Sequence, residues 1–218
     1  MGYNIAIDGP AGAGKSTIAK LVAKKKGYIY VDTGAMYRGL AVHFLKKGIQ
    51  PEEKEKIEQA CEDASIRIVY EDGAQQVYLN GENITGSLRE EAVGNMASRS
   101  AGISAVRAKL LELQRNLAKE ENVVMDGRDI GTHVLPNADV KVYLTASVET
   151  RAKRRYDELT AKGVACDYNE IAADIKERDE RDMTRDIAPL KQAEDATLVD
   201  SSDMTIDEVT EAIIALCK

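Results

Sequence analysis

The chain has 218 residues, of which 44% are hydrophobic and 31% are charged, and its formal net charge is −7. A chain of this length and composition can bury the core of one globular domain, which excludes an intrinsically disordered protein. The acidic balance argues against a nucleic-acid-binding protein, because such a protein needs a basic surface to offset phosphate repulsion. Local arginines can still hold a small anion, so we predict no nucleic-acid partner but allow an anionic substrate.

Apolar runs and cysteines indicate the compartment. No run approaches the ~20 residues that cross a bilayer, so we expect no membrane partner. The first residues lack the basic segment and cleavage site of a signal peptide, and we expect none. Cys61, Cys166 and Cys217 form no paired motif and are expected to be reduced thiols. These features predict a cytoplasmic protein, and since no exposed apolar helix stripe stands out, we expect a monomer.

Short apolar strands alternate with amphipathic helices, which predicts an α/β fold with a parallel sheet. In chain order we predict a strand over Tyr3–Asp8, a helix over Lys15–Lys26, a strand over Tyr28–Asp32, a helix over Ala35–Lys47, strands over Val123–Asp126, Val140–Thr145 and Leu198–Asp200, and a last helix from Ile206. The apolar runs are typical of strands covered on both faces, and they predict a five-stranded parallel sheet.

Residues 65–85 break this alternation. Ser65–Tyr70 and Gln76–Leu79 alternate polar with apolar residues around a turn over Glu71–Gln75 that contains Asp72-Gly73, which predicts a β-hairpin. Glu82–Thr85 is predicted as a third antiparallel strand. Such a patch within an α/β chain indicates an inserted antiparallel β subdomain, and the pattern alone leaves its ligand open.

The segment from Gly9 to Ser16 satisfies the phosphate-binding pattern G-x-x-x-x-G-K-[ST] between a predicted strand and a predicted helix. Its glycines let backbone N–H groups close around a phosphate, and the helix N-terminus favours an anion. We expect Lys15 on the β- and γ-phosphates of ATP and the Ser16 hydroxyl on Mg²⁺, with Asp126 as a candidate for the metal's outer shell. A glycine-rich turn without a ligand is the alternative, and the strand–helix context disfavours it. The predicted ATP-binding residues of the loop are Gly9, Pro10, Ala11, Gly12, Ala13, Gly14, Lys15, Ser16 and Thr17.

Two predicted helices each carry arginines on one face. These are Arg151, Arg154 and Arg155 over Glu149–Glu158, and Arg178, Arg181 and Arg185 with Asp182 over Ile175–Asp186. Either the helices are solvated, with ion pairs such as Arg154–Glu158 and Arg178–Asp182, or they form a lid over phosphates. Three arginines on one arc repel one another unless an anion lies between them, so we favour the helical lid. A lid indicates a kinase, which must keep water from the γ-phosphate.

Polar residues after two predicted strands indicate the acceptor. Asp32–Arg38 and Gly127-Arg128-Asp129 fall at the carboxyl edge of the sheet, where ligands of α/β proteins bind. Arg38 and Arg128 together could grip a phosphate, which predicts a phosphomonoester as the acceptor. Asp32 or Asp129 could instead act as the base for an alcohol acceptor, so that alternative stays open.

Together these motifs resemble the bacterial-type cytidylate kinases, in the nucleoside monophosphate kinase group of P-loop proteins. The resemblance runs from about Ile5 to the last helix and includes the segments Asp126–Thr132, Ile175–Asp182 and Ala188-Pro189-Leu190. It implies transfer of the γ-phosphate of ATP to CMP, and also to dCMP, in pyrimidine nucleotide metabolism with Mg²⁺ as cofactor. It divides the single domain 1–218 into a core (about 1–38, 100–150 and 187–218), a CMP-binding insertion (about 39–99) and a lid (about 151–186).

The resemblance also implies roles for single residues. The implied contacts are Arg38, Arg128 and Arg185 for the acceptor phosphate, Ser98, Arg107 and Asp129 for cytosine, Asp182 with Arg178 for the ribose, and the stretch Ala193–Asp200 for adenine. Thr33 stands where some relatives carry serine and joins the substrate site. The expected catalytic residues are Lys15, Arg128, Arg178 and Arg185, and the expected lid contacts to ATP are Arg151, Arg154 and Arg155. The alternatives are a related kinase acting on UMP, AMP or an alcohol, and a nucleotide-binding module without turnover.

Overall fold

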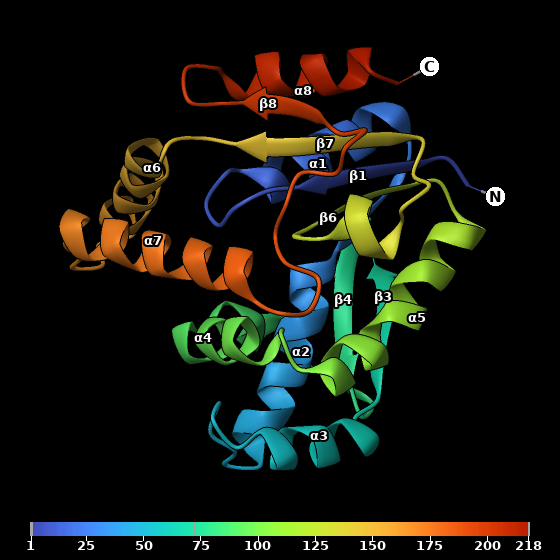
Figure 1. Ribbon diagram of the computed structural model, residues 1–218, viewed down its shortest axis with the longest axis vertical. Coiled ribbons are helices and arrows are strands. Elements are labelled where there is room, and N and C mark those ends of the chain that lie inside the picture. Colours follow the sequence, from blue (N-terminus) through green and yellow to red (C-terminus); the bar gives the residue numbers. More distant parts are fainter. Residues whose placement is uncertain (1, 72, 218) are drawn as a thin grey trace.

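The computed structural model describes residues 2–71 and 73–217. Within these ranges, a parallel central sheet of five strands has the order β2 (Ile29–Asp32), β6 (Val123–Gly127), β1 (Asn4–Asp8), β7 (Val140–Thr145) and β8 (Thr197–Asp200). Both the α/β class and the five parallel strands predicted from the sequence are confirmed. The sheet crosses the upper half of the molecule in Figure 1.

The two faces of the central sheet are covered by different helices. Ile5 and Ile7 pack in one apolar cluster with α1 (Lys15–Lys26) and α8 (Ile206–Ala215). Ala6 between them points to the other cluster, where α2 (Thr33–Lys46) and α5 (Ser104–Glu120) pack. This alternation follows from the period of two along a strand, and because both faces are apolar, the strands read as continuous hydrophobic runs. None of the helices in the described parts of the chain is long and apolar enough to cross a membrane.

The predicted hairpin is present as a second, antiparallel sheet, here called the inserted sheet. Its strands in the described chain are β3 (Ile66–Glu71), β4 (Ala74–Leu79) and β5 (Glu82–Asn83). The predicted turn was too long, because Glu71 and Ala74 already pair; Asp72 lies outside the described residues. The third strand is shorter than predicted, because the Asn83 side chain accepts a hydrogen bond from the Thr85 N–H and a 3₁₀ turn, η1 (Thr85–Arg89), begins there.

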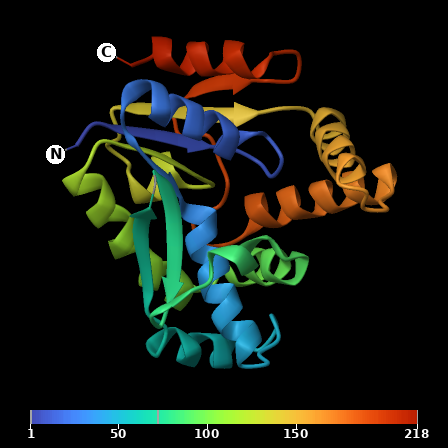
Figure 2. The same ribbon diagram turned by 180° about the vertical axis from the view of Figure 1, so that it is seen from behind.

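Three helices between residues 54 and 120 were not predicted. They are α3 (Lys54–Glu62), α4 (Glu91–Ser100) and α5, and Figure 2 shows α3 at the end of the molecule opposite α8. Helix α2 also begins at Thr33 rather than Ala35, because the Asp32 carboxylate accepts a hydrogen bond from the Ala35 N–H at 2.8 Å. Side-chain capping of this kind satisfies an otherwise unpaired N–H and fixes where a helix begins.

The two arginine-bearing helices form a helical hairpin on one side of the molecule, α6 (Val148–Ala161) and α7 (Tyr168–Thr184) (Figure 1). Helix α7 begins earlier than predicted, because the Asp167 carboxylate accepts hydrogen bonds from the N–H groups of Asn169 and Glu170. It ends at Thr184, so Arg185 follows the helix rather than belonging to it.

Candidate functional site

A cavity of about 720 Å³ opens where the strands of the central sheet end. It is bounded by the loop after β1, the segments after β2 and β6, the end of α4, both helices of the α6–α7 hairpin, and the segment before α8. The predicted site residues that line it are Ala11, Gly12, Ala13, Gly14, Lys15, Ser16, Thr17, Thr33, Arg38, Ser98, Arg107, Asp126, Arg128, Asp129, Arg151, Arg154, Arg155, Arg178, Asp182 and Arg185. The fold therefore brings together residues that lie far apart in the sequence, from Ala11 to Arg185.

Gly9 and Pro10 belong to the phosphate-binding pattern but are not among the lining residues of this cavity. Gly9 lies against β7, where an added Cβ would come within 1.9 Å of the Leu144 carbonyl oxygen. The Pro10 carbonyl accepts a hydrogen bond from Lys15 Nζ at 2.6 Å. These two residues therefore shape the loop from behind, whereas residues 11–17 face the cavity.

Helix α1 begins at this cavity without a side-chain cap. Its N-cap is Gly14 in the left-handed conformation (φ 85°), and its first turn carries no acidic residue. Ser147 caps α6, Asp167 caps α7, and Thr205 and Glu208 form a capping box on α8, whereas α3, α4 and α5 also begin without a side-chain cap. The first N–H groups of a helix need an acceptor, so an anion in the cavity would satisfy those of α1.

Ser16 and Asp126 meet beside the phosphate loop. The Ser16 hydroxyl donates to Asp126 Oδ2 at 2.9 Å, and the Tyr30 hydroxyl donates to Asp126 Oδ1 at the same distance. Burial, followed by the nearby Asp32 carboxylate, raises the pKa of Asp126 to about 6. Serine and carboxylate oxygens side by side are suitable ligands for a hard cation, and the residues present therefore fit Mg²⁺. Tyr30 was missed from the sequence because nothing in its own segment marks it.

Lys15 is buried close to this pair. Burial lowers the pKa of its ammonium group, and the positive charge of Arg128 lowers it further, while Asp126 and Asp8 act in the opposite sense. The nearby carboxylates thus offset only part of the cost of burying this positive charge at the cavity wall. A negatively charged ligand would supply the missing charge.

Two further groups of ionic contacts face the phosphate loop. Arg38 pairs with Asp32 at 3.1 Å, next to Thr33, whose hydroxyl donates to the Asp126 carbonyl at 2.7 Å. Arg128 Nε donates to Asp182 at 2.8 Å. A separate buried cluster contains Arg107, Asp129 and Arg185: Arg107 forms a short ion pair with Asp129, and Arg185 lies 3.5 Å from the other oxygen of the same carboxylate.

Arg178 is the least satisfied cation of the site. Its Nε is buried and, like Nε of Arg107, has no hydrogen-bond partner among the described residues; unlike Arg107, Arg178 is in none of the described ion pairs. Burial, then repulsion from Arg128, lowers the pKa of its guanidinium to about 10. A buried, unpaired guanidinium is costly, and an anion bound in the cavity would remove that cost.

The two ion pairs named for solvated helices, Arg154–Glu158 and Arg178–Asp182, are not among the described ion pairs, although Arg155–Glu158 and Arg181–Glu177 are surface pairs of the same kind. Glu158 pairs with Arg155 and Lys162, and Asp182 pairs with Arg128. The contacts of the remaining arginines are Arg151 with Asp179 at 2.7 Å and with the Ala11 carbonyl at 2.8 Å, Arg154 with the Ser201 carbonyl at 2.6 Å, and Arg181 with Glu177 and Ser98. Arg181 is not among the lining residues, so fewer of the predicted arginines face the cavity than the pattern indicated.

The charge of the cavity is opposite to that of the chain. Its described lining residues include nine lysine and arginine side chains and five carboxylates, a net charge of +4, whereas the whole chain carries −7. Positive charge in a partly buried cleft attracts anions and concentrates them.

The segment that the resemblance implies for adenine differs from the segment that lines the cavity near α8. Residues 193–200, expected over adenine, contribute no lining residue in the described structure, and Ser201, Met204, Thr205, Ile206 and Val209 lie there instead. The difference arises because Thr197–Asp200 is strand β8, so the chain turns into the cavity only after the strand ends. These residues are mostly apolar and form no recognisable motif, so the sequence did not indicate that they line the cavity.

A phosphate loop at the end of β1, with arginine clusters facing it across a positively charged cavity, is the arrangement of a P-loop phosphotransferase acting on small anions. Comparison with known proteins then identifies the family. The chain matches the cytidylate kinase family over residues 5–218. It is 51% identical to the cytidylate kinase of Caldicellulosiruptor bescii, over 98% of this chain and 94% of that protein. It is also 51% identical to the cytidylate kinase of an Exiguobacterium species, over 96% and 93% respectively.

The chain therefore belongs to the cytidylate kinase family, a family of nucleoside monophosphate kinases, and the resemblance noted in the sequence is confirmed. Among solved structures, an uncharacterized protein from Eubacterium ventriosum aligns with a TM-score of 0.52 at 15% identity, covering 98% of this chain and 96% of that chain. That similarity concerns the fold alone.

Proposed function

We propose that this protein transfers the γ-phosphate of ATP to CMP, giving ADP and CDP, and that dCMP is a second acceptor. The observation that carries the proposal is a cavity in which the phosphate loop faces arginines from α2, from the segment after β6 and from the α6–α7 hairpin. A transfer between two phosphates requires two anions held end to end, and this cavity offers cations on both sides. The family membership supports the same reaction.

In the proposed complex, residues 11–17 hold the triphosphate of ATP. Lys15 would neutralise charge on the β- and γ-phosphates, and the uncapped N-terminus of α1 would bind their oxygens through backbone N–H groups. Ser16 and Asp126 would hold Mg²⁺, which supplies charge neutralisation to the phosphates when bound. Arg151, Arg154 and Arg155 are proposed to complete the donor side from α6.

The acceptor would occupy the opposite side of the cavity. Its phosphate is assigned to Arg38, Arg128 and Arg185, its cytosine to Ser98, Arg107 and Asp129, and its ribose to Asp182 and Arg178, with Thr33 beside them. The unpaired guanidinium of Arg178 supports an anion at this point. The buried Arg107–Asp129 pair offers fixed polar groups of both kinds, which suits the edge of a pyrimidine base.

A phosphate acceptor is supported over an alcohol by the state of the two candidate bases. Asp32 is paired with Arg38, and Asp129 lies between Arg107 and Arg185. The oxygens of both carboxylates already accept hydrogen bonds or ion pairs from the protein, so neither carboxylate is free to bond to the hydroxyl group of an alcohol acceptor. A phosphate oxygen is already anionic near neutral pH and needs no base. Catalysis would then depend on positioning and on charge neutralisation by Lys15, Arg128, Arg178 and Arg185.

The experiment is a coupled assay of ADP release with CMP, dCMP, UMP, AMP and a simple alcohol as acceptors. We expect turnover with CMP well above UMP and AMP, and turnover with dCMP. Lys15→Met, which removes the ammonium group but keeps the chain length, is expected to lower kcat by about 10²- to 10³-fold, the usual effect of losing one such group. Turnover with the alcohol alone, or equal rates for Lys15→Met and wild type, would contradict the proposal.

We further propose a division of labour among three parts of the chain: a core (about 1–38, 100–150 and 187–218), a CMP-binding insertion (about 39–99) and a lid (about 151–186). The protein is proposed to act as a monomer in the cytoplasm. The three free cysteines, Cys61, Cys166 and Cys217, support a reducing compartment.

A further inference from the structure

The inserted sheet lies in the segment proposed to bind the acceptor, yet its described strands contribute nothing to the cavity wall. Between residues 39 and 99, the lining residues are Ala97 and Ser98, and both belong to α4. Any influence of β3, β4 and β5 on the acceptor must therefore pass through another part of the chain.

Two side chains of the inserted sheet reach β2: Tyr70 donates to the Tyr30 carbonyl at 3.2 Å, and Gln75 contacts Asp32 at the acceptor side. Gln75 on β4 accepts a hydrogen bond from the Asp32 N–H at 2.9 Å through Oε1, and it donates from Nε2 to the Asp32 carbonyl at 3.1 Å. Asp32 ends β2, an edge strand of the central sheet. The amide of Gln75 thus pairs with Asp32 as the backbone of a neighbouring strand would.

Asp32 in turn fixes two residues that line the cavity. Its carboxylate accepts a hydrogen bond from the Ala35 N–H in the first turn of α2. The same carboxylate pairs with Arg38, one turn further along the helix. The next residue, Thr33, bonds to the Asp126 carbonyl. A shift of the Asp32 backbone would therefore move both Arg38 and Thr33.

Apolar packing already holds the inserted sheet in place without Gln75. Ile66 and Val77 lie so close to α2 that a Cβ added to Gly39 would come within 3.1 Å of each. Both belong to, or pack against, the main apolar cluster of this side of the molecule. The polar contact of Gln75 is thus available to set the position of Asp32 rather than to attach the sheet.

We propose that Gln75 is a positioning residue for the acceptor site, which holds Asp32 and thereby places Arg38 for the acceptor phosphate. This inference rests on the proposed function, since it assigns the side of the cavity near Arg38 to the acceptor. It gives the inserted sheet a role in acceptor binding that needs no contact with the nucleotide.

The test compares Gln75→Met with Gln76→Met. Methionine matches glutamine in length and volume but removes both hydrogen bonds to Asp32. Gln76 is the next residue on the same strand; its Oε1 accepts from Asn83 within the inserted sheet at 3.4 Å, so its replacement is a matched control. For Gln75→Met we expect KM for CMP to rise by about fivefold or more, and KM for ATP to change less than about twofold, because only the acceptor side loses hydrogen bonds. Gln76→Met should behave like the wild type.

A second readout is independent of turnover. In amide hydrogen exchange of the unliganded protein, the Asp32 N–H should exchange at least about tenfold faster in Gln75→Met than in Gln76→Met, since its acceptor is gone. Equal exchange in the two variants, or equal increases of KM for CMP and ATP, would overturn the inference. Failure of the proposed function would show differently, as absence of CMP turnover in the wild type while the exchange result stands.

Discussion

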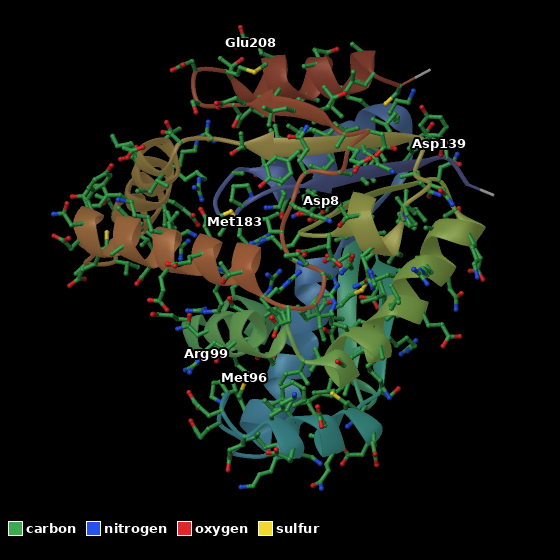
Figure 3. All side chains as sticks on the ribbon, in the orientation of Figure 1. Asp8, Met96, Arg99, Asp139, Met183 and Glu208 are labelled. Carbon is green, nitrogen blue, oxygen red and sulfur yellow. The ribbon has the colours of Figure 1, made fainter. Side chains whose placement is uncertain are left out.

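Asp8 is a carboxylate in the interior of the molecule, at the end of β1 (Figure 3). Its two oxygens accept hydrogen bonds from the N–H groups of Ile130 and Gly131, each at 2.7 Å. These residues begin the short turn η2 (Ile130–Val134), directly after the predicted acceptor residues Arg128 and Asp129. Asp8 therefore ties the strand that leads into the phosphate loop to the segment that carries the proposed acceptor contacts.

The titration of Asp8 gives a prediction for stability. Burial raises the pKa of Asp8 from 3.8 to about 6. Because the folded protein binds this proton more tightly than the unfolded chain, the Asp8 contribution to stability is full below pH 4 and is lost as pH rises to about 6. A shift of about two pKa units corresponds to roughly 3 kcal/mol. We expect the free energy of unfolding of the wild type to fall by this order relative to Asp8→Asn between pH 4 and pH 7.

Urea unfolding at several pH values measures this difference. Asparagine cannot titrate and loses one acceptor, which gives Asp8→Asn a constant offset at every pH, so only the pH-dependent part of the comparison carries the prediction. A difference between the two proteins that stays flat from pH 4 to pH 7 would show that Asp8 titrates normally in the folded state.

Single residues explain why some site roles cannot be predicted from the sequence alone. The glycines and Lys15 of the phosphate loop stand next to one another in the chain, so their spacing is a motif. Tyr30 and Gln75 act on residues 96 and 43 positions away, and only the folded chain brings them into contact. Their identity as tyrosine and glutamine carries no signal before the contact is known.

At the scale of elements, the α6–α7 hairpin is tied to the phosphate loop by one buried ion pair. Arg151 of α6 and Asp179 of α7 contact each other at 2.7 Å. Arg151 also donates to the Ala11 carbonyl, and Asp179 accepts from the Ala11 N–H at 3.4 Å. Removing one partner of a buried pair leaves the other charge uncompensated, which is strongly unfavourable.

We therefore predict that Asp179→Asn loosens the hairpin from the loop. KM for ATP should rise by about tenfold in the coupled assay, because Arg151 loses the charge that orients it at the loop. Glu177→Gln breaks the exposed Arg181–Glu177 pair of the same helix and should leave KM for ATP unchanged, since surface pairs contribute about 0–1 kcal/mol. Similar KM values for the two variants would argue against a special role of the buried pair.

The elements themselves differ in how far the sequence predicts them. The inner strands β1, β6 and β7 are buried along most of their length, and such runs of apolar residues are readily recognised, whereas β8 buries only Val199. Helices α3, α4 and α5 were missed, and each buries only a few positions, such as Val93, Met96, Ala97 and Ser100 on α4. The start of α7 depends on Asp167, whose capping role was visible only once the helix was known.

At the scale of the whole molecule, the positive cavity in an acidic chain indicates that the unliganded protein contains unrelieved repulsion. A ligand that binds the folded state stabilises it in proportion to the logarithm of its excess over Kd, about 2.7 kcal/mol at a hundredfold excess. We expect saturating CMP with ATP to raise Tm by about 5–10 °C. Inorganic phosphate should raise Tm more than chloride at equal ionic strength, because it can span several guanidinium groups.

Differential scanning calorimetry of wild type and Arg178→Gln provides the measurement and its control. Nε of Arg178 is buried without a hydrogen-bond partner among the described residues, and Arg178 is in none of the described ion pairs. Its replacement should raise Tm of the unliganded protein and reduce the gain from ligands. A lower Tm for unliganded Arg178→Gln would mean that the guanidinium is stabilising in the unliganded protein, contrary to the prediction.

The segments that form the site could be predicted from the sequence more completely than the contacts between side chains within it. The phosphate loop, the two arginine helices and the segments after β2 and β6 were each recognised from local patterns, and topology then brings them to one edge of the sheet. Which carboxylate pairs with which arginine depends on tertiary packing, as Asp182 with Arg128 rather than Arg178 illustrates. The segment lining the cavity before α8 is set by where β8 ends, which the apolar pattern fixes only to within a few residues.

Side chains of the inserted sheet cover the exposed edge of β2, and this affects how copies of the protein can associate. An exposed edge strand offers N–H and carbonyl groups that can template the addition of a foreign strand and start aggregation. Here Tyr70 donates to the Tyr30 carbonyl at 3.2 Å, and Gln75 uses both backbone groups of Asp32. Side chains of the inserted sheet thus occupy the hydrogen-bonding groups that an incoming chain would need. They do so on a strand whose last residue, Asp32, lines the cavity, where a bulky protective loop would obstruct entry.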